Sequence, residues 1–284
     1  MKVLLIGGRG FIGREILLQL KQLGWEVTEF NRTEANPLGY MNKLAVTELF
    51  ANHSFDCVIS TAWNTTHSTY RDSSENFQHQ AATEYLASEA KHYSVPIFLA
   101  LGSAAEYGDN NLAATSLSST LKPVDNYSSA KISTFLSLTK IFESTGTLLI
   151  WHRIFQPYGH GQDMSRFLPT LISKVSSGST MEIKNPRHIY DWIHVIDVAK
   201  AVLYSIKNKI GGAIDVGTGI GTSNEQLASV VSNVFGVKYL ASKASADSPV
   251  KGLVMDSNTH LLNHGWAPDF ALEAGIKDLV SKQS

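Results

Sequence analysis

The stretch VLLIGGRGFIG (residues 3–13) joins an apolar run to a loop with glycines at positions 7, 10 and 13. The run predicts a buried strand, and Phe11 to Leu23 has the periodicity of an amphipathic helix. Gly7 permits a tight turn, Gly10 lets the backbone approach a pyrophosphate, and Gly13 lets the helix pack closely on the strand. Such a loop predicts a dinucleotide site, with a plain glycine-rich turn as the alternative. The predicted cofactor contacts in it are Gly7, Arg9, Gly10, Phe11, Ile12 and Gly13.

Beyond this loop, short apolar runs alternate with segments of helical periodicity, as in a parallel sheet covered by helices. The predicted strands are Val3 to Ile6, Glu26 to Phe30, Cys57 to Ser60, Ile97 to Leu101 and Leu148 to Trp151. The predicted helices are Phe11 to Leu23, Glu75 to Tyr93 and Ser128 to Glu143. Right-handed crossovers place the carboxyl ends of these strands along one edge. The expected fold class is therefore α/β, with a Rossmann doubly wound parallel sheet.

After Trp151 the alternation of predicted strands and helices becomes less regular. The segments PYGHGQ, SSGS and KNPRH supply turn residues between shorter elements there. We predict one more strand at Ala213 to Val216 and helices at Asn224 to Phe235 and Ala271 to Val280. These features indicate a smaller mixed α/β domain for the substrate. The predicted division gives residues 1–157 and 188–216 to a dinucleotide-binding domain, and residues 158–187 and 217–284 to a substrate-binding domain.

The composition narrows the function classes. The chain has 284 residues, 43% hydrophobic, with 24 Lys and Arg against 25 Asp and Glu. Such a balance gives no field that would concentrate a nucleic acid or dock the protein on an acidic membrane. The single Cys57 lies in an apolar run, lacks a disulfide partner and lacks the companions of a zinc site. The N-terminal apolar run is too short for a secretory signal. We expect a cytoplasmic enzyme without a metal site.

The residues after the second predicted strand indicate which dinucleotide binds. An acidic residue at this place grips the ribose hydroxyls of NAD. This chain has Asn31, Arg32 and Thr33 there instead. Arg32, joined by Arg9 from the glycine loop, can pair with a 2′-phosphate, because a guanidinium suits bidentate phosphate contacts. The pattern favours NADP over NAD; the alternative is that both arginines are solvated surface residues.

A catalytic constellation is predicted from Ser103, Tyr127 and Lys131. The tyrosine and the lysine are four residues apart, hence on one face of a helix. A phenol titrates near 10, so it needs a neighbouring ammonium to act as an acid or base near neutral pH, and we expect Lys131 to lower its pKa. Ser103 follows the predicted strand Ile97 to Leu101, where its hydroxyl can orient the reacting oxygen. Taken singly, each of the three residues is more simply structural.

The chain as a whole resembles the extended short-chain dehydrogenase/reductases of the NAD-dependent epimerase/dehydratase family, which act on nucleotide sugars. The similar segments are GGRGFIG, YSSAK, GSAAEYG (102–108), RIFQPYGHGQ (153–162), YDWIHVIDVAKAV (190–202), IDVGTGIGTSNEQLA (214–228) and HGWAPDFALEAGI (264–276). The resemblance implies that Ser103 and Tyr127 contact the sugar oxygen and that Lys131 contacts the cofactor ribose. It also implies that Thr61, Ala62 and Leu101 line the inner face of the cofactor.

For the substrate, the resemblance implies contacts from Gln156, which stands where the family usually has Asn, and from Arg166, Phe167 and Arg187. The alternative for the last three is an ordinary surface or packing role. Sugar 4,6-dehydratases of the family carry an Asp-Glu pair after the Ser or Thr, and this chain has Ala104 and Ala105. Dehydration is therefore disfavoured. The epimerase-reductase that makes GDP-fucose is disfavoured too, because it needs a Cys and His pair at the sugar.

Three functions stay open on this basis. The leading hypothesis is an NADP-dependent 4-ketoreductase of a nucleoside-diphosphate 4-keto-6-deoxy sugar. The closest alternative is a nucleotide-sugar 4-epimerase, which uses the same residues but keeps a tightly held NAD. A third, of another class, is a non-catalytic dinucleotide sensor or scaffold, since fold alone does not settle function. The resemblance also implies a homodimer formed through two helices per subunit.

Overall fold

The computed structural model describes residues 1–179, 181–237 and 250–281. Its larger sheet has six parallel strands in the order β2-β1-β3-β4-β6-β9. These strands are β1 (Lys2–Ile6), β2 (Glu26–Phe30), β3 (Cys57–Ser60), β4 (Ile97–Ser103), β6 (Leu148–Ile154) and β9 (Gly212–Val216). The strand order reverses between β1 and β3, and in sheets of this kind ligands bind in the crevice outside the carboxyl ends at that point.

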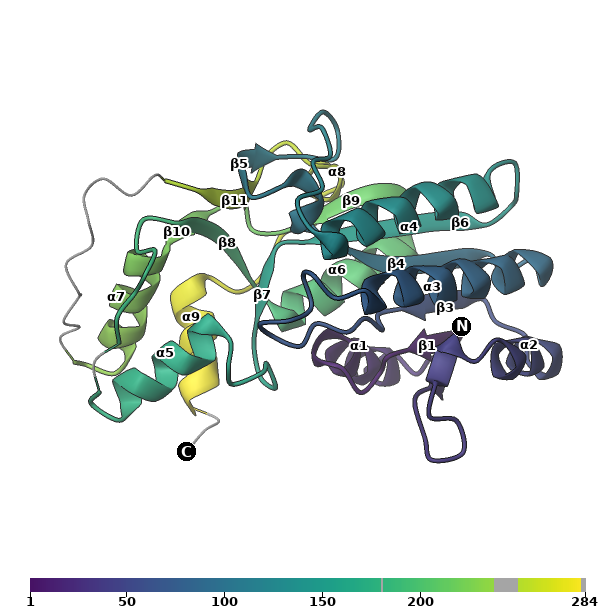
Figure 1. Cartoon of the computed structure of the whole chain (residues 1–284), viewed down its shortest axis with the longest axis horizontal. Helices are drawn as coiled ribbons and strands as arrows, with labels where there is room; N and C mark the ends of the chain where they lie inside the picture. The colour runs from purple at the N-terminus through teal and green to yellow at the C-terminus, as the bar shows by residue number, and fades with distance from the viewer. Residues whose placement is uncertain (180, 238–249, 282–284) are drawn as a thin grey trace.

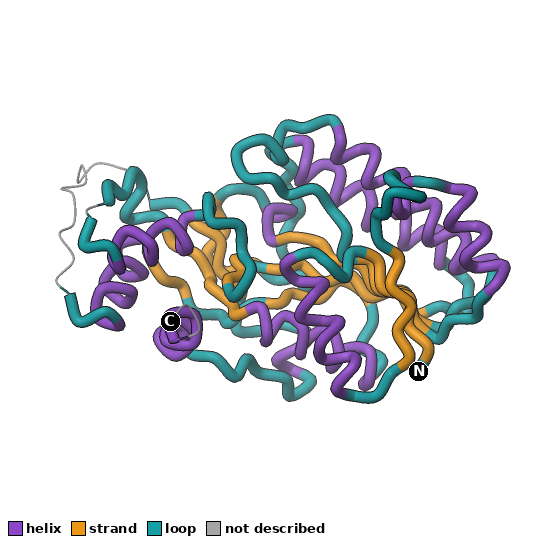
Figure 2. The backbone as a smooth tube through the Cα atoms, turned by 90° about the horizontal axis from the view of Figure 1, so that it is seen from below, coloured by secondary structure: helices purple, strands orange, loops and turns teal. Residues whose placement is uncertain are grey.

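Helices cover both faces of the larger sheet (Figures 1 and 2). One face carries α1 (Phe11–Gln22) and α6 (Val195–Asn208). The other carries α2 (Lys43–Asn52), α3 (Glu75–His92) and α4 (Asn126–Phe142), with the short 3-10 helices η1 (Gly39–Met41) and η2 (Ala104–Tyr107) in the connections. Side chains alternate along each strand, so β1, β2, β3, β4 and β6 contribute to both cores, whereas β9 contributes to the core beneath α1 and α6.

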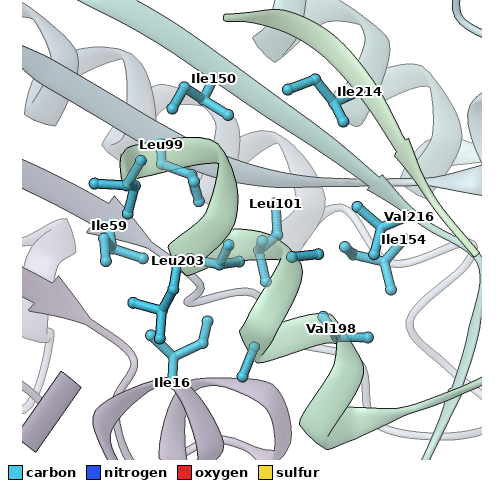
Figure 3. Close-up of a cluster of buried hydrophobic side chains, with 14 of the residues drawn as sticks. Ile16, Ile59, Leu99, Leu101, Ile150, Ile154, Val198, Leu203, Ile214 and Val216 are labelled. Carbon is cyan, nitrogen blue, oxygen red and sulfur yellow. The ribbon is translucent and has the colours of Figure 1, made fainter. Parts of the chain in front are cut away.

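The core beneath α1 and α6 is built from aliphatic side chains of several strands. Figure 3 shows Ile16 of α1 and Leu203 of α6 against Ile59, Leu99 and Ile150 of the sheet. All five side chains are buried. Burial of an aliphatic side chain of this size stabilises the fold by about 1.5–3 kcal/mol. The strands are thus held firmly, and so are the residues at their carboxyl ends.

The smaller sheet lies at the other end of the molecule (Figure 1) and mixes strand directions. Its order is β10-β8-β11-β5, and β7 also pairs with β8. These strands are β5 (Asn110–Ala114), β7 (Gln156–Tyr158), β8 (Ile189–His194), β10 (Gly221–Ser223) and β11 (Gly252–Met255). Its helices are α5 (Phe167–Ser176), α7 (Asn224–Val234) and α9 (Leu272–Ser281), which share one core, while α8 (His260–Asn263) lies beside β9.

The predicted fold class is confirmed, and every predicted strand is present. The strands β4 and β6 run further than expected, to Ser103 and Ile154. Sequence periodicity missed α2, α5 and α6, as well as the short strands of the smaller sheet. In the proposed domain division, β8 of the stretch 188–216 joins the smaller sheet, whereas α6 and β9 join the larger one. Residues 180, 238–249 and 282–284 of the proposed substrate domain lie outside the described residues.

Candidate active site

The structure brings Ser103, Tyr127 and Lys131 together at the carboxyl end of β4. Ser103 is the last residue of that strand, and the other two lie one turn apart on α4. The start of α4 is fixed by its N-cap Asp125, whose carboxylate accepts the Ser128 N–H at 2.7 Å. Arg71 holds this cap from outside, with 2.8 Å between its guanidinium and Asp125 and with its carbonyl oxygen accepting the Tyr127 N–H at 2.9 Å. The predicted constellation is therefore held by the local structure.

Lys131 is buried between the strand end and an aromatic side chain. Its ammonium donates to the Leu101 carbonyl oxygen at 2.7 Å and lies 3.5 Å from the centre of the Trp63 ring. Burial lowers the pKa of Lys131 to about 7, and the negative charge of Glu106 opposes that shift. An ammonium with so low a pKa is sensitive to small changes around it. A pKa perturbed in this way is common among residues of functional sites.

Tyr127 is also buried, with its ring edge-on to Tyr70 at 4.9 Å between centroids. Burial raises the pKa of the Tyr127 phenol above its ordinary value, and a hydrogen bond with the Ser103 side chain opposes the shift. The sequence predicted that Lys131 lowers this pKa, and the structure gives the opposite direction, because loss of hydration, together with Tyr70 and Glu106, outweighs the Ser103 hydrogen bond and the charge of Arg71. The phenol is therefore protonated near neutral pH.

The glycine loop fits a dinucleotide pyrophosphate. A Cβ on Gly13 would overlap the Gly7 carbonyl oxygen and approach the Thr61 hydroxyl to 2.7 Å. Gly7 itself has φ +85°, which favours glycine. The N-cap of α1 is Gly10, and no side chain caps the helix, so the first amides of this twelve-residue helix are available to an anion. Thr61 ties the loop to the sheet by donating to the Ile6 carbonyl oxygen at 2.9 Å.

A cavity of about 460 Å³ joins the glycine loop to the predicted catalytic residues. The predicted site residues that line it are Gly10, Phe11, Ile12, Gly13, Thr61, Leu101, Ser103, Tyr127, Lys131, Gln156 and Arg166. Lining residues that the sequence analysis missed include Trp63, Asn64, Tyr70, Arg71, Phe155, Tyr190 and Leu253. Trp63 could have been suspected, because it directly follows Thr61 and Ala62. Tyr190 begins the segment 190–202 that carries the resemblance, but nothing local gave it a site role, and Leu253 of the smaller sheet carried no local signal.

Several predicted contacts lie elsewhere. Ala62 adjoins the cavity, and its carbonyl oxygen accepts the Tyr40 hydroxyl at 3.1 Å. Arg9 and Arg32 are not among the lining residues, and Asn31 donates to Glu29 at 3.2 Å. Arg187 is exposed and does not line the cavity.

Phe167 packs in the core of the smaller domain.

A second depression, of about 710 Å³, lies between α1 and α6 and contains none of the predicted catalytic or cofactor residues. The predicted catalytic residues therefore lie at the smaller of the two cavities. Within the described ranges, no group of three His, Cys, Asp or Glu residues could hold a metal ion, and no helix is long and apolar enough to span a bilayer.

Comparison with known proteins agrees with this geometry. Residues 3–217 match the model of the NAD dependent epimerase/dehydratase family. A GDP-6-deoxy-D-talose 4-dehydrogenase from Aggregatibacter actinomycetemcomitans is 26% identical over 232 residues, which are 80% of this chain and 78% of that protein. A CDP-abequose synthase from Salmonella muenchen is 28% identical over 155 residues, which are 52% of this chain and 53% of that protein.

Among solved structures, the UDP-glucose 4-epimerase of Thermus thermophilus in complex with NAD superposes with a TM-score of 0.85. Its sequence is 21% identical, and the match covers 99% of this chain and 98% of that one. At this identity the likeness concerns the fold, and it confirms a Rossmann sheet with a smaller mixed sheet beside it.

Proposed function

Because this chain belongs to the NAD dependent epimerase/dehydratase family, we propose that it is an NADP-dependent 4-ketoreductase of a nucleoside-diphosphate 4-keto-6-deoxy sugar. The observation that carries the proposal is the meeting of Ser103, Tyr127 and Lys131 with the glycine loop in one cavity. The names of the two sequence relatives support it. One is a 4-dehydrogenase of a 6-deoxy sugar nucleotide, and the other makes a nucleotide sugar.

In the proposed reaction, the Ser103 and Tyr127 hydroxyls donate to the C4 carbonyl oxygen and polarise it. A dinucleotide held by the glycine loop and Lys131 would supply the hydride for C4. Tyr127 gives its proton to the same oxygen, so that the ketone becomes an alcohol, and it regains a proton from solvent. Lys131 holds the ribose hydroxyls of the cofactor and places a positive charge beside Tyr127 as the phenolate forms. The raised pKa of Tyr127, which favours the protonated phenol, suits this direction.

The preference for NADP rests on Arg32 and Arg9. Arg32 lies just after the end of β2, and Arg9 lies in the glycine loop. A 2′-phosphate would lie beside these two places. Glu29 is the acidic residue closest in sequence to that strand end, and it is engaged by Lys21 at 3.5 Å and by Asn31. A guanidinium at such a place pairs readily with a phosphate, because it presents two parallel donors.

The substrate diphosphate is assigned to the side of the cavity where Arg166 lies. Arg166 is the N-cap of α5, lines the cavity and lies 5.1 Å from the Tyr70 ring centre. Its guanidinium donates to the Thr65 carbonyl oxygen at 2.6 Å, so it spans from the smaller domain to the loop after β3. Gln156 lines the same cavity as Ser103 and is proposed to contact the sugar. The roles of Phe167 and Arg187 stay predictions.

The test is a cofactor titration followed by turnover. The purified protein is stripped of bound nucleotide and titrated with NADPH and NADH by fluorescence. It is then mixed with NADPH and a nucleoside-diphosphate 4-keto-6-deoxy sugar. A preference for exchangeable NADPH and its stoichiometric oxidation would support the reductase. Tightly retained NAD with no net oxidation would favour a 4-epimerase instead.

The non-catalytic alternative has its own test. If the protein were a dinucleotide sensor, Tyr127→Phe would leave its cellular function intact. The homodimer and the cytoplasmic location also stay predictions; sedimentation of the purified protein tests the first of them.

A further inference from the structure

Glu106 is a fully buried carboxylate directly behind Ser103. It belongs to η2, which follows β4, and its exposed fraction is 0%. The two residues before it, Ala104 and Ala105, line the cavity, whereas Glu106 does not. Its position behind the cavity wall separates it from direct contact with a ligand. A buried carboxylate is costly unless each oxygen is paired, so its partners show what it does.

The hydrogen-bond partners of Glu106 belong to the catalytic end of the larger sheet. One carboxylate oxygen accepts the Ser103 N–H at 2.9 Å and the Trp151 indole N–H at 3.0 Å. The other accepts from Arg153 at 2.6 Å, and both side chains of this ion pair are buried. A Cβ at Gly102 would collide with both Trp151 and Glu106, so the neighbouring strand residue leaves room for this arrangement.

Lys131 reaches the same strand end from α4. It binds the Leu101 carbonyl oxygen, two residues before Ser103, and its ammonium lies 5.9 Å from the centre of the Trp151 ring. The titratable groups around Lys131 are Tyr127 on its own helix, His79 on α3 and Glu106 on η2, with Arg153 of β6 behind Glu106.

Near neutral pH, Tyr127 and His79 are uncharged, since burial raises the pKa of the first and lowers that of the second to about 4. Burial works against the charge of Lys131, and Glu106 works for it. Stability alone does not explain the buried pair of Glu106 and Arg153, because apolar residues of similar volume often stabilise a core as well or better.

We infer that Glu106 is a positioning residue of the hydride-transfer site: it fixes the Ser103 backbone from behind and keeps Lys131 charged in a buried place. This role rests on the proposed function, since it serves the same three residues. The hydrogen bond to the Ser103 N–H sets where the Ser103 hydroxyl points. The negative charge offsets the loss of hydration that Lys131 suffers.

The first experiment reads Lys131 directly, without cofactor or substrate. The protein is labelled with ¹³C at the lysine ε-carbons, and the resonance absent in Lys131→Met assigns the Lys131 signal. Its pH titration should have a midpoint near 7 in the unmodified protein. The double variant Glu106→Gln with Arg153→Gln removes both charges and keeps hydrogen-bonding groups. Its midpoint should fall by about one pH unit or more, as expected when a nearby opposite charge is lost.

The matched control is Asp215→Asn. Asp215 is a fully buried carboxylate of the same network, which accepts the Tyr107 hydroxyl at 2.7 Å and the Ser116 N–H at 2.5 Å. This variant should leave the Lys131 midpoint in place. If the double variant fails to fold, the single Glu106→Gln replaces it, and its midpoint should fall further because Arg153 stays positive. An unchanged midpoint in either folded Glu106 variant would overturn the inference.

The second experiment joins Glu106 to the reaction. The pH dependence of kcat is measured for the unmodified protein and for the Glu106 variant. The alkaline limb should move to lower pH together with the Lys131 midpoint, and Glu106→Asp, which keeps the charge, should restore most of its position. A moved midpoint with an unmoved limb would refute the role in catalysis. Absence of turnover in the unmodified protein would instead count against the proposed function and leave the titration result standing.

Discussion

The larger sheet takes its first four strands from consecutive βα units, whereas the smaller sheet collects β5, β8, β10 and β11 from four separate parts of the chain. The first construction puts the glycine loop and Ser103 along one edge by repetition of a single local rule. The second puts Tyr190 and Leu253 into the cavity through pairings that no local pattern announces. The comparison teaches that the residues proposed for hydride chemistry belong to the locally encoded part. Those proposed for substrate choice belong to the part assembled from distant segments.

The largest effect is expected for Tyr127→Phe, which tests whether the hydride chemistry belongs to the larger half of the molecule. Loss of the proton donor should lower kcat by about 10²–10⁴-fold, the range of general acid catalysis. NADPH affinity and the substrate KM should change little, because the ring and its contact with Tyr70 remain. Steady-state kinetics beside a fluorescence titration checks this. Equal losses in kcat and in NADPH binding would show that the hydroxyl holds the cofactor instead.

The pH dependence of the free energy of unfolding tests the burial of His79 in the larger half of the molecule. His79 accepts the Asn64 N–H at 3.0 Å on Nε2, so its other nitrogen carries the proton toward the Tyr40 oxygen at 2.6 Å. Burial lowers the pKa of His79 to about 4, against about 6.5 in an unfolded chain. The unfolded state therefore binds more protons between these values, and the free energy of unfolding should fall as pH drops from about 6.5 to 4, by about 3 kcal/mol.

Denaturant unfolding at several pH values measures this dependence. The variant His79→Gln, which cannot titrate, should show a flatter curve over the same range. A curve as steep as that of the unmodified protein would assign the effect to other groups.

Arg166→Ala sharpens the comparison from the smaller half. This variant removes a guanidinium from the proposed diphosphate side of the cavity and its bond to Thr65. The substrate KM should rise about tenfold, near the 1.4 kcal/mol that such a ratio represents. The dissociation constant of NADPH should stay the same. Arg166→Lys, which keeps charge without the planar fork, should recover only part of the loss.

Arg32→Ala carries the smallest expected effect, because a phosphate contact near the surface is screened by salt. The preference for NADPH over NADH should drop by about fivefold to tenfold, as loss of one charge-assisted contact implies. Paired titrations with both cofactors at low salt measure it. Arg187→Ala, exposed and outside the cavity, is the comparison variant and should leave the preference unchanged.

Most strands of the larger sheet and the residues at their carboxyl ends could be predicted from the sequence, because the patterns that mark them are local. The glycine spacing at 7, 10 and 13 reports backbone crowding within one turn, and the four-residue step from Tyr127 to Lys131 reports one helix face. The expectation that Lys131 lowers the pKa of Tyr127 was wrong, because local spacing does not determine that pKa. The degree of burial decides that pKa, and burial depends on what else packs around the residue.

By itself the sequence determined the α/β class, the dinucleotide loop and the identity of the three residues at the strand end. Only the tertiary structure decided that Trp63 lies under Lys131, that Glu106 and Arg153 form a buried pair behind Ser103, and that Arg187 stands apart from the cavity. The reason is physical. Spacing along a helix or strand fixes direction, whereas burial, charge and contact depend on distances between residues that are far apart in the chain.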